Sequence, residues 1–384
     1  MQRFTRHALT AGAAIGMLSL VAPVAAGADS LRHGSAHDVG ARHAVFVQTD
    51  NTSGNQIVAY NRAPDGLLTW DHTYDTNGLG GELNGSVVDH LASQASLAYD
   101  ASHSLVFAVN AGSNTVSVFS AFGDDLRLRQ VVWSGGAFPV SVAIHGNLVY
   151  VLNALDGGSV SGFRIDGGWL HRIWGSTRSL GLTIPTDTTQ FTHTPGQVAF
   201  SPDGSQLLVT SKANGNDVDV FAVRPDGKLS WSPTVNAEPG TVPFAITFDA
   251  AGRLVLAEAG TDAVATFGLA SGGNISPISS AVTNEAATCW VTQAQGFLFA
   301  SDAGGPAETS VKDSSSGQLT VLSNTATDPG AVDASASRGG QYLYVQTGKS
   351  GVVDEFSVGS SGALSPVGAV TVPDAVGGEG IVAF

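Results

Sequence analysis

The chain contains a single cysteine, Cys289, among its 384 residues. One cysteine excludes any disulfide within the chain, so the folded protein must be stabilised by its core and its topology alone. Cys289 lies between apolar residues in the segment ATCWVT. This setting is typical of a buried, unreactive thiol rather than of a nucleophile.

Basic residues are also scarce, with 17 Lys and Arg against 32 Asp and Glu and a formal net charge of −15. Such a surface repels phosphate backbones and anionic lipid headgroups, which argues against nucleic acid as a partner. After the leader, no segment is apolar over the length of a membrane span. The motifs GxSxG, HExxH, CxxC and the P-loop are absent. We therefore expect neither a cofactor nor a metal.

A leader occupies residues 1–28. Two arginines precede an apolar stretch, which small residues close with Ala26 and Ala28 in the pattern A-x-A. This pattern predicts a signal peptide and export, and a membrane anchor is the alternative. We therefore expect a secreted monomer with a flexible linker over residues 29–43 and no membrane partner after cleavage.

The rest of the chain is rich in glycine, with 48 residues, and repeats one pattern. Residues 197–231 contain four strand candidates separated by Pro and Asp-Gly turn signals. The third strand candidate ends near an aromatic or aliphatic marker, which recurs at Tyr60, Phe119, Phe163, Phe221, Phe267, Val311 and Phe356. Most intervals are about 45 residues, the period of a propeller blade. The sequence therefore predicts an all-β, seven-bladed β-propeller over residues 44–384.

Two of the intervals are longer, with extra residues around Asp71–Gln94 and His171–Thr192. In addition, the first unit begins at its second strand, whereas the seventh has four strands and continues into GIVAF, residues 380–384. We expect this last segment to join blade one as its innermost strand and close the ring, which leaves no free sheet edge. Neither a sandwich nor a solenoid accounts for seven equal units with a permuted first one.

Polar residues recur where loops of a propeller surround the central channel, after second strands and before inner strands. Counting nine residues back from the markers gives Asn110, Lys212, Glu258, Asp302 and Thr347, with Asn153 and Asn51 as looser matches. The loops before inner strands add Asp89, His90, His193, Glu238, Glu285, Asp328, Asp374 and Glu379. The alternative is that Asn and Asp at such turns bond their own backbone.

The pattern PxxVAFSPDGxxLLV…NxVxVF…xxGxL resembles the seven-bladed lactonase family, over about residues 44–384. That family includes propeller-type bacterial 6-phosphogluconolactonases and fungal 3-carboxymuconate lactonizing enzymes. The resemblance implies lactone chemistry at the channel mouth. The catalytic phrases differ, because Gly196 and Gln197 stand where the family has Arg and His. Phe138 replaces a histidine, and Lys212 replaces a carboxylate.

Two functions follow from these patterns. The first is an exported lactonase-like hydrolase or isomerase acting on a small lactone, sugar acid or carboxylic acid. Its base would be His193 or Glu258, with Lys212 as the oxyanion or carboxylate partner and Asp302 beside them. Candidates for substrate binding are Asn110, Asn153, Glu238 and Asp328. The second is a non-catalytic propeller that binds a glycan, peptide or protein on this face. A lid over the channel favours an enzyme, whereas a broad open face favours binding.

Overall fold

Almost all regular structure is β-strand in residues 43–384, the part of the chain that the computed structural model describes. The predicted signal peptide and the linker up to residue 42 lie outside these residues. Within the described part, no helix has the length and apolar character needed to cross a membrane. The strands form seven separate antiparallel sheets, which are the blades.

The first three blades are named here from the channel outward. Blade one consists of β29 (Ile381–Ala383), β1 (Ala44–Gln48), β2 (Gln56–Arg62) and β3 (Leu68–Asp75). Blade two consists of β4 (Leu97–Asp100), β5 (Leu105–Asn110), β6 (Thr115–Phe122) and β7 (Asp125–Trp133), with the 3-10 helix η1 (Ala111–Ser113). Blade three consists of β8 (Pro139–His145), β9 (Leu148–Asn153), β10 (Ser159–Asp166) and β11 (Trp169–Arg172), and β12 (Arg178–Ser179) also pairs with β10.

The other four blades have the same strand order. Blade four consists of β13 (Val198–Phe200), β14 (Gln206–Thr210), β15 (Asp217–Ala222) and β16 (Thr234–Ala237), with the one-turn helices α1 (Gln190–His193) and α2 (Lys212–Gly215) nearby. Blade five consists of β17 (Pro243–Phe248), β18 (Leu254–Glu258), β19 (Ala263–Leu269) and β20 (Ile275–Val282). Blade six consists of β21 (Thr288–Ala294), β22 (Phe297–Asp302), β23 (Ala307–Asp313) and β24 (Leu319–Ala326). Blade seven consists of β25 (Ala331–Ala336), β26 (Tyr342–Thr347), β27 (Val352–Val358) and β28 (Leu364–Thr371).

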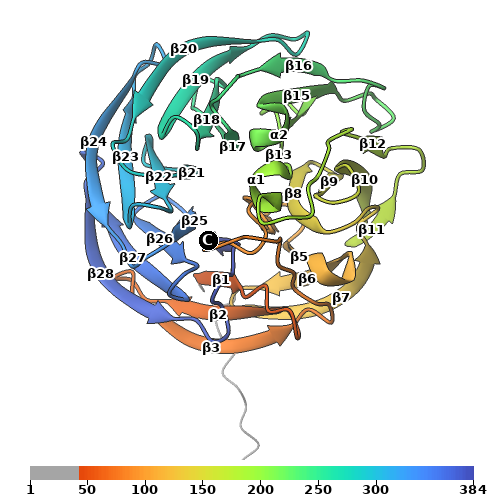
Figure 1. The fold of residues 1–384 in the computed structure, drawn as a ribbon. Helices are drawn as coiled ribbons and strands as arrows, with labels where there is room; N and C mark the ends of the chain where they lie inside the picture. The colour runs from red at the N-terminus through yellow and green to blue at the C-terminus, as the bar shows by residue number, and fades with distance from the viewer. Residues whose placement is uncertain (1–42) are drawn as a thin grey trace, which may run out of the picture. The chain divides into compact units, whose positions relative to one another are not determined.

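The inner strands form a closed ring. Each one contacts the next in the order β29, β4, β8, β13, β17, β21 and β25, and β25 contacts β29 again. Figure 1 shows this arrangement along the channel, with the outer strands at the rim. The predicted seven-bladed propeller is therefore confirmed.

The seven markers read from the sequence have a structural meaning. All lie on third strands, and all are buried. The pairing of third and fourth strands shifts register at the marker in five blades, at Tyr60, Phe119, Phe267, Val311 and Phe356. A β-bulge bends and twists a strand locally. The marker thus fills the core at the point where the outer strand curves away from the ring.

The C-terminal strand closes the ring as predicted. Residues Val45, Phe46 and Val47 of β1 pair with β29. The ring of Phe384 stacks on Tyr99 of blade two at 4.2 Å between centroids and lies 5.5 Å from Phe46. The C-terminal segment therefore completes blade one by backbone pairing and contacts blade two by aromatic packing.

The two insertions meet each other above the ring. The backbone amide of Asn84, in the first insertion, donates to Oε1 of Gln190 at 2.9 Å. The amide side chain of Asn84 donates to the carbonyl oxygen of Thr186 at 2.9 Å. In Figure 1, α1 of the second insertion lies toward the centre of the ring. The inserted residues therefore extend over the channel instead of away from it.

Candidate functional site

A pocket of about 230 Å³ lies at the channel mouth, between the two insertions and the inner ends of blades five and six. We call it the mouth pocket. Its walls are mostly apolar and aromatic, with one carboxylate, and consist of Val87, Val88, Asp89, Ala92, Phe191, Phe244, Ala287, Cys289, Trp290, Ala303 and Gly304. Apolar pockets with a few polar groups are typical of small-molecule sites.

Left-handed turns precede the two inner strands that form the floor of the mouth pocket. Val242, before β17, has φ of 50°, and Ala287, before β21, has φ of 58°. Their backbone amides donate to Oδ1 of Asn216 at 3.2 Å and Oδ1 of Asp262 at 2.7 Å. A β-branched residue at positive φ is strained, and such strain persists only where surrounding contacts hold it. The turns therefore fix where β17 and β21 begin.

The two insertions form what we call the roof of the mouth pocket. Aromatic side chains near the start of these two strands lie against it. The ring centroids of Phe244 and Trp290 are 4.9 Å apart. The indole Nε1 of Trp290 donates to the carbonyl oxygen of Ser93, in the first insertion, at 2.6 Å. Because this bond joins blade six to the loop before blade two, it holds the roof across the channel.

Asp89 is the carboxylate of the mouth pocket. Its Oδ1 accepts from the backbone amide of Leu91 at 2.7 Å, and its Oδ2 accepts from that of Ser93 at 2.8 Å. Burial raises the pKa of Asp89 to about 6, although these amides and the charge of Lys212 oppose the rise. A carboxylate with such a pKa is ionised at neutral pH and is a stronger base than an exposed one.

Lys212 lies buried behind the wall of the mouth pocket. Its Nζ donates to the carbonyl oxygens of Ala92 and Phe191, both at 2.6 Å, and to Oγ1 of Thr194 at 3.0 Å. Burial lowers the pKa of Lys212 to about 7, and the charge of Asp89 opposes this. The three acceptors use all three N–H groups of an ammonium ion, so the geometry favours the charged form. Lys212 thus holds both insertions, and its predicted role toward a substrate stays a prediction.

More buried carboxyl groups lie beside Asp89 in the channel. Oδ2 of Asp50 accepts from the backbone amide of Glu379 at 2.8 Å, and Oδ2 of Asp333 accepts from that of Ile381 at 3.3 Å. Burial raises the pKa of Asp50 to about 8 and that of Asp333 to about 7, and it raises the pKa of Glu379 well above its usual range. No set of three or more His, Cys, Asp or Glu within residues 43–384 is placed to hold a metal ion. These carboxyls anchor the start of β29.

The predicted catalytic residues Glu258 and Asp302 have different surroundings. Glu258 lines a separate pocket of about 390 Å³ together with Glu238. Burial and the nearby Glu238 raise the pKa of Glu258 to about 7. Asp302 is buried and accepts from the hydroxyls of Thr288 at 2.5 Å and Thr309 at 2.6 Å. The structure therefore brings Glu238 and Glu258 together, whereas Lys212 and Asp302 belong to other surroundings.

The four remaining predicted residues form polar contacts with neighbouring protein groups. The amide of Asn110 donates to Oγ of Ser117 at 2.8 Å, and the amide of Asn153 donates to the carbonyl oxygen of Ser159 at 3.4 Å. Nδ1 of His193 lies 2.9 Å from the carbonyl oxygen of Thr189, within one turn of α1. The backbone amide of Asp328 donates to Asp354 at 2.8 Å. None of the four lines the mouth pocket, and their roles in binding or catalysis stay predictions.

The positions that depart from the lactonase pattern have structural contacts here. The backbone amide of Ile246 donates to Oε1 of Gln197 at 2.5 Å, which links blades four and five. A Cβ atom on Gly196 would lie 2.8 Å from the carbonyl oxygen of Phe244. Phe138 has φ of 60° and its backbone amide donates to Asn114 at 2.7 Å. These positions therefore form contacts between neighbouring blades.

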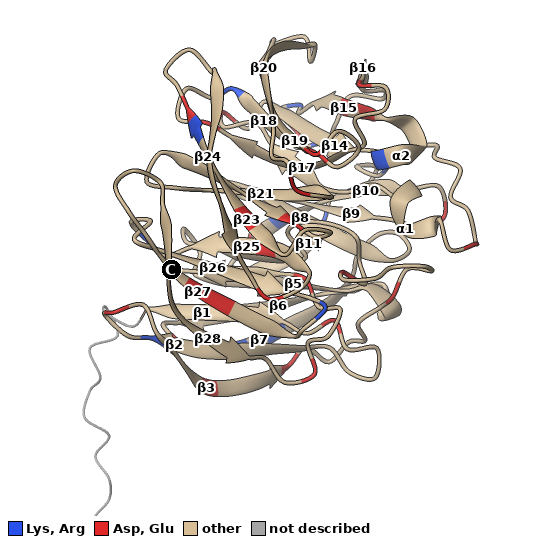
Figure 2. Cartoon of the chain, turned by 60° about the vertical axis from the view of Figure 1, so that its left-hand side comes forward, with Lys and Arg blue, Asp and Glu red and all other residues tan. Residues whose placement is uncertain are grey.

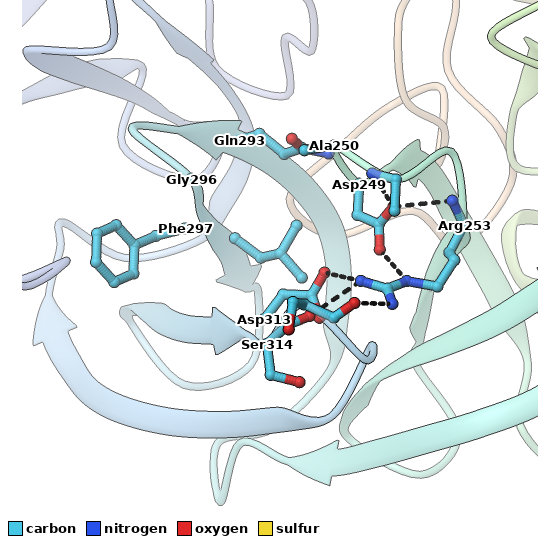
Figure 3. Close-up of a pocket in the computed structure, with 11 residues that line it drawn as sticks. Asp249, Ala250, Arg253, Gln293, Gly296, Phe297, Asp313 and Ser314 are labelled. Carbon is cyan, nitrogen blue, oxygen red and sulfur yellow. Dashed lines mark hydrogen bonds and ion pairs between the residues drawn. The ribbon is translucent and has the colours of Figure 1, made fainter.

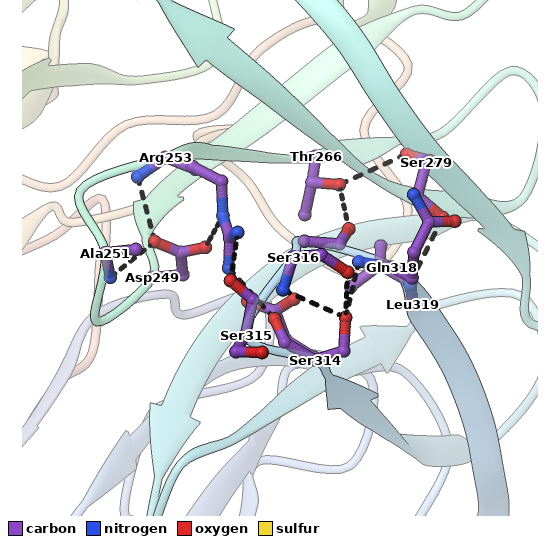
Figure 4. Close-up of polar contacts among 12 residues, drawn as sticks. Asp249, Ala251, Arg253, Thr266, Ser279, Ser314, Ser315, Ser316, Gln318 and Leu319 are labelled. Atoms are coloured by element: carbon purple, nitrogen blue, oxygen red, sulfur yellow. Dashed lines mark hydrogen bonds and ion pairs between the residues drawn. The ribbon is translucent and has the colours of Figure 1, made fainter.

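A second pocket, of about 300 Å³, lies at the turns between the first and second strands of blades five and six and at the turn after β23 (Figure 3). Arg253 forms ion pairs with Asp249 and, at 3.4 Å, with Asp313 across the two blades. Its guanidinium also donates to the carbonyl oxygen of Ser315 at 2.8 Å (Figure 4). Since the charged groups of this pocket bond one another, they join blade five to blade six.

Comparison with known proteins agrees with the fold. The sequence matches no protein-family model and no curated protein sequence. Among solved structures, it is similar to the periplasmic gluconolactonase of Pseudomonas aeruginosa, at 16% identity and a TM-score of 0.71 over 89% of this chain and 99% of that one. It is equally similar to a Bacteroides fragilis protein provisionally identified as a 6-phosphogluconolactonase, at 19% identity and a TM-score of 0.71 over 90% and 99%. A virginiamycin B lyase from Staphylococcus aureus is more distant, at 14% identity and a TM-score of 0.53 over 76% and 88%.

At such low identities these likenesses establish the fold and nothing finer. The chain has the lactonase-like propeller fold, and at that level the resemblance read from the sequence is confirmed. The substrate and the reaction belong to a proposal.

Sequence reasoning named Asp89 and Glu379 among many loop residues but did not select them. It missed the aromatic wall formed by Phe191, Phe244 and Trp290. These side chains come from an insertion and two different blades, so no local spacing links them. The one available signal was that both inner strands begin with a large aromatic side chain, in VPFAITF and ATCWVT.

Proposed function

We propose that this protein is an exported hydrolase that opens a small, uncharged lactone with an apolar body in the mouth pocket. The observation that supports the proposal most is that the two insertions cover the mouth pocket. Residues of both insertions line the mouth pocket, and Lys212 ties the two insertions together. The two insertions cover part of a bound substrate and hold it beside Asp89, which suits catalysis better than display of a broad binding face.

Asp89 is the base in the proposed reaction. Its carboxylate takes a proton from a water molecule while the water oxygen attacks the lactone carbonyl carbon. The ring C–O bond then breaks, and the leaving alkoxide takes the proton back from Asp89. The product is a hydroxy acid, which ionises at neutral pH. Its new negative charge is repelled by Asp89 and by any neighbouring carboxyl that is ionised, and this favours release.

The chemistry of the walls defines the class of substrate. Val88, Phe191 and Trp290 offer apolar contact. The ammonium of Lys212 has protein acceptors for all its protons, so it is not available to neutralise a phosphate. A phosphorylated sugar lactone would place an unpaired dianion next to Asp89, at high cost. An alkyl or aryl lactone fits the same pocket without that cost.

The test compares hydrolysis of dihydrocoumarin and δ-decanolactone with that of glucono-δ-lactone and its 6-phosphate. The two apolar lactones should be hydrolysed with the higher kcat/KM. The variant Asp89→Asn should lose kcat by about a hundredfold to ten-thousandfold, the usual contribution of a general base. Asp156→Asn, which changes an exposed carboxylate on a left-handed loop residue, is the matched control and should keep full activity.

Lactone binding measured by calorimetry separates the two functions. If the Asp89→Asn variant binds dihydrocoumarin but does not hydrolyse it, the result supports the proposal. Wild-type protein that binds the lactone without opening it contradicts the proposal and favours a non-catalytic binding protein. Preference for the phosphorylated sugar lactone contradicts the assigned substrate class.

A further inference from the structure

Three exposed tryptophans lie on the outer rim of blades two to four, away from the mouth pocket. Trp133 ends β7, Trp174 follows β11, and Trp231 precedes β16. Trp174 and Trp231 keep 81% and 82% of their surface exposed, and Trp133 keeps 53%. Clusters of exposed apolar side chains mark interaction sites, and Trp contributes strongly to binding when it is covered.

Two arginines link these rings into one surface. The Arg172 guanidinium lies 4.5 Å from the ring centroid of Trp133 and 5.8 Å from that of Trp174. It also donates to Oγ1 of Thr177 at 3.0 Å. Arg178 lies 4.7 Å from the ring centroid of Trp231, and its Nη1 donates to the carbonyl oxygen of Gly175, next to Trp174, at 3.0 Å. We call Trp133, Arg172, Trp174, Arg178 and Trp231 the outer tryptophan surface.

The positive charge that this surface offers to a ligand is that of Arg172, because Arg178 is buried. Neither Arg172 nor Arg178 takes part in an ion pair within residues 43–384. Arg178 is held by carbonyl oxygens, including those of Leu229 at 2.6 Å and Ser230 at 2.7 Å. Arg172 has the single side-chain bond to Thr177 in this part of the chain, which leaves N–H groups for a ligand. Figure 2 shows how few Lys and Arg the strands carry.

We propose that the outer tryptophan surface binds an acidic polysaccharide made of uronic-acid sugars. The flat C–H face of a sugar ring stacks on an indole, and the guanidinium fork of Arg172 matches a sugar carboxylate. Trp174 and Trp231 are almost fully open to solvent, so a chain lying across this surface has both rings to stack on. An acidic peptide supplies the carboxylate but no flat C–H faces for the rings.

The test measures binding of the full chain to polygalacturonate, with dextran as the neutral glycan and polyglutamate as the acidic peptide. Polygalacturonate should bind most tightly. Replacing both Trp174 and Trp231 by Ala should weaken binding about tenfold or more, and Arg172→Gln should weaken it as well. Trp70→Ala is the matched control, because Trp70 is 57% exposed on β3 of blade one and should not affect binding.

The outcomes separate the partners. Equal affinity for polyglutamate would overturn the proposal, because charge alone would explain the binding. Equal affinity for dextran would show that Arg172 does not bind a sugar carboxylate, because dextran has none. Loss of binding in Trp70→Ala as large as in the double variant would show that the surface is not the site. The tryptophans are exposed, so the thermal unfolding temperature of each variant should match wild type and show that the fold is intact.

Discussion

The ammonium of Lys212 donates a hydrogen bond of 2.6 Å to the carbonyl oxygen of Ala92, which lies 120 residues earlier in the chain. Ala92 also lines the mouth pocket. One side chain from blade four therefore fixes the loop that carries Asp89, three residues before Ala92. The proposed base and the roof depend on the same contact.

Replacing Lys212 by Met should destabilise the protein and loosen the roof. The change leaves the acceptors on Ala92, Phe191 and Thr194 without their donor, and each unsatisfied buried group costs about 1–3 kcal/mol. We expect a lower thermal unfolding temperature and faster protease cleavage between residues 76 and 96. Lys349→Met, at an exposed position, is the control. If the Lys212 variant unfolds at the wild-type temperature and its roof resists the protease as in wild type, Lys212 does not hold the two insertions in place.

The pH dependence of activity should report Asp89. Because its pKa is raised to about 6, kcat/KM for an apolar lactone should rise with pH through about 6 and level off above it. In Lys212→Met, Asp89 loses the positive charge that lowers its pKa, so the rise should move to higher pH. A profile that is flat between about pH 5 and 8, or a shift toward lower pH in the variant, would exclude Asp89 as the base.

Stability should fall as the pH rises from about 5 to 8.5. The pKa of Asp50 rises from 3.8 to about 8 on folding, and that of Asp333 from 3.8 to about 7. The folded state then binds more protons than the unfolded state over this range. The stabilisation is complete below about pH 4 and is lost as the pH rises through 8.

Lys212, whose pKa is lowered to about 7, acts in the opposite direction above that pH. The carboxyl groups dominate the pH dependence of stability, because Lys212 is a single group. Burial also raises the pKa values of Glu258 and Asp219 to about 7. Thermal unfolding across the pH range is the measurement, and Asp50→Asn should flatten the curve. An unfolding temperature that increases toward pH 8.5 would contradict this balance.

Removing the aromatic ring of Phe384 should weaken ring closure. Its side chain packs on Tyr99 and Phe46 of two blades, and losing a partly buried aromatic costs about 1.5–3 kcal/mol. Phe384→Ala should therefore lower the unfolding temperature by several degrees. Phe122→Ala, which removes a ring that is 46% exposed at the rim, should change it little. Equal effects in the two variants would mean that the packing of the Phe384 ring does not contribute to ring closure.

The fold could be predicted because the sequence of each blade carries the same local signals. Turn signals and a buried marker recur in every unit, and the marker position coincides with a β-bulge at, for example, Phe119 and Phe267. Closure was also predictable, because the first unit lacks an inner strand and residues 380–384 resemble one. These features are local, so a single sequence reveals them.

The site was harder to predict because its contacts cross between blades. Counting from the marker places Lys212 at the mouth. However, the position equivalent to Asn110 at the end of β5 is Ser211, directly after β14, because Phe221 pairs with Leu207 and Phe119 with Val106. The direction of the Lys212 side chain depends on two insertions that follow no repeat. Likewise, nothing local to Asp89 shows that Trp290 contacts the same loop.

The most direct test of the mouth pocket is a crystal structure of Asp89→Asn soaked with dihydrocoumarin. The Asn side chain has the size of Asp but loses one of the two oxygens that accept backbone amides, and the variant should slow turnover enough to trap the lactone. We predict electron density between Phe191 and Trp290, with the lactone carbonyl facing residue 89. Density only at another site, or an empty mouth pocket in a variant that hydrolyses the lactone at the wild-type rate, would contradict the proposed function.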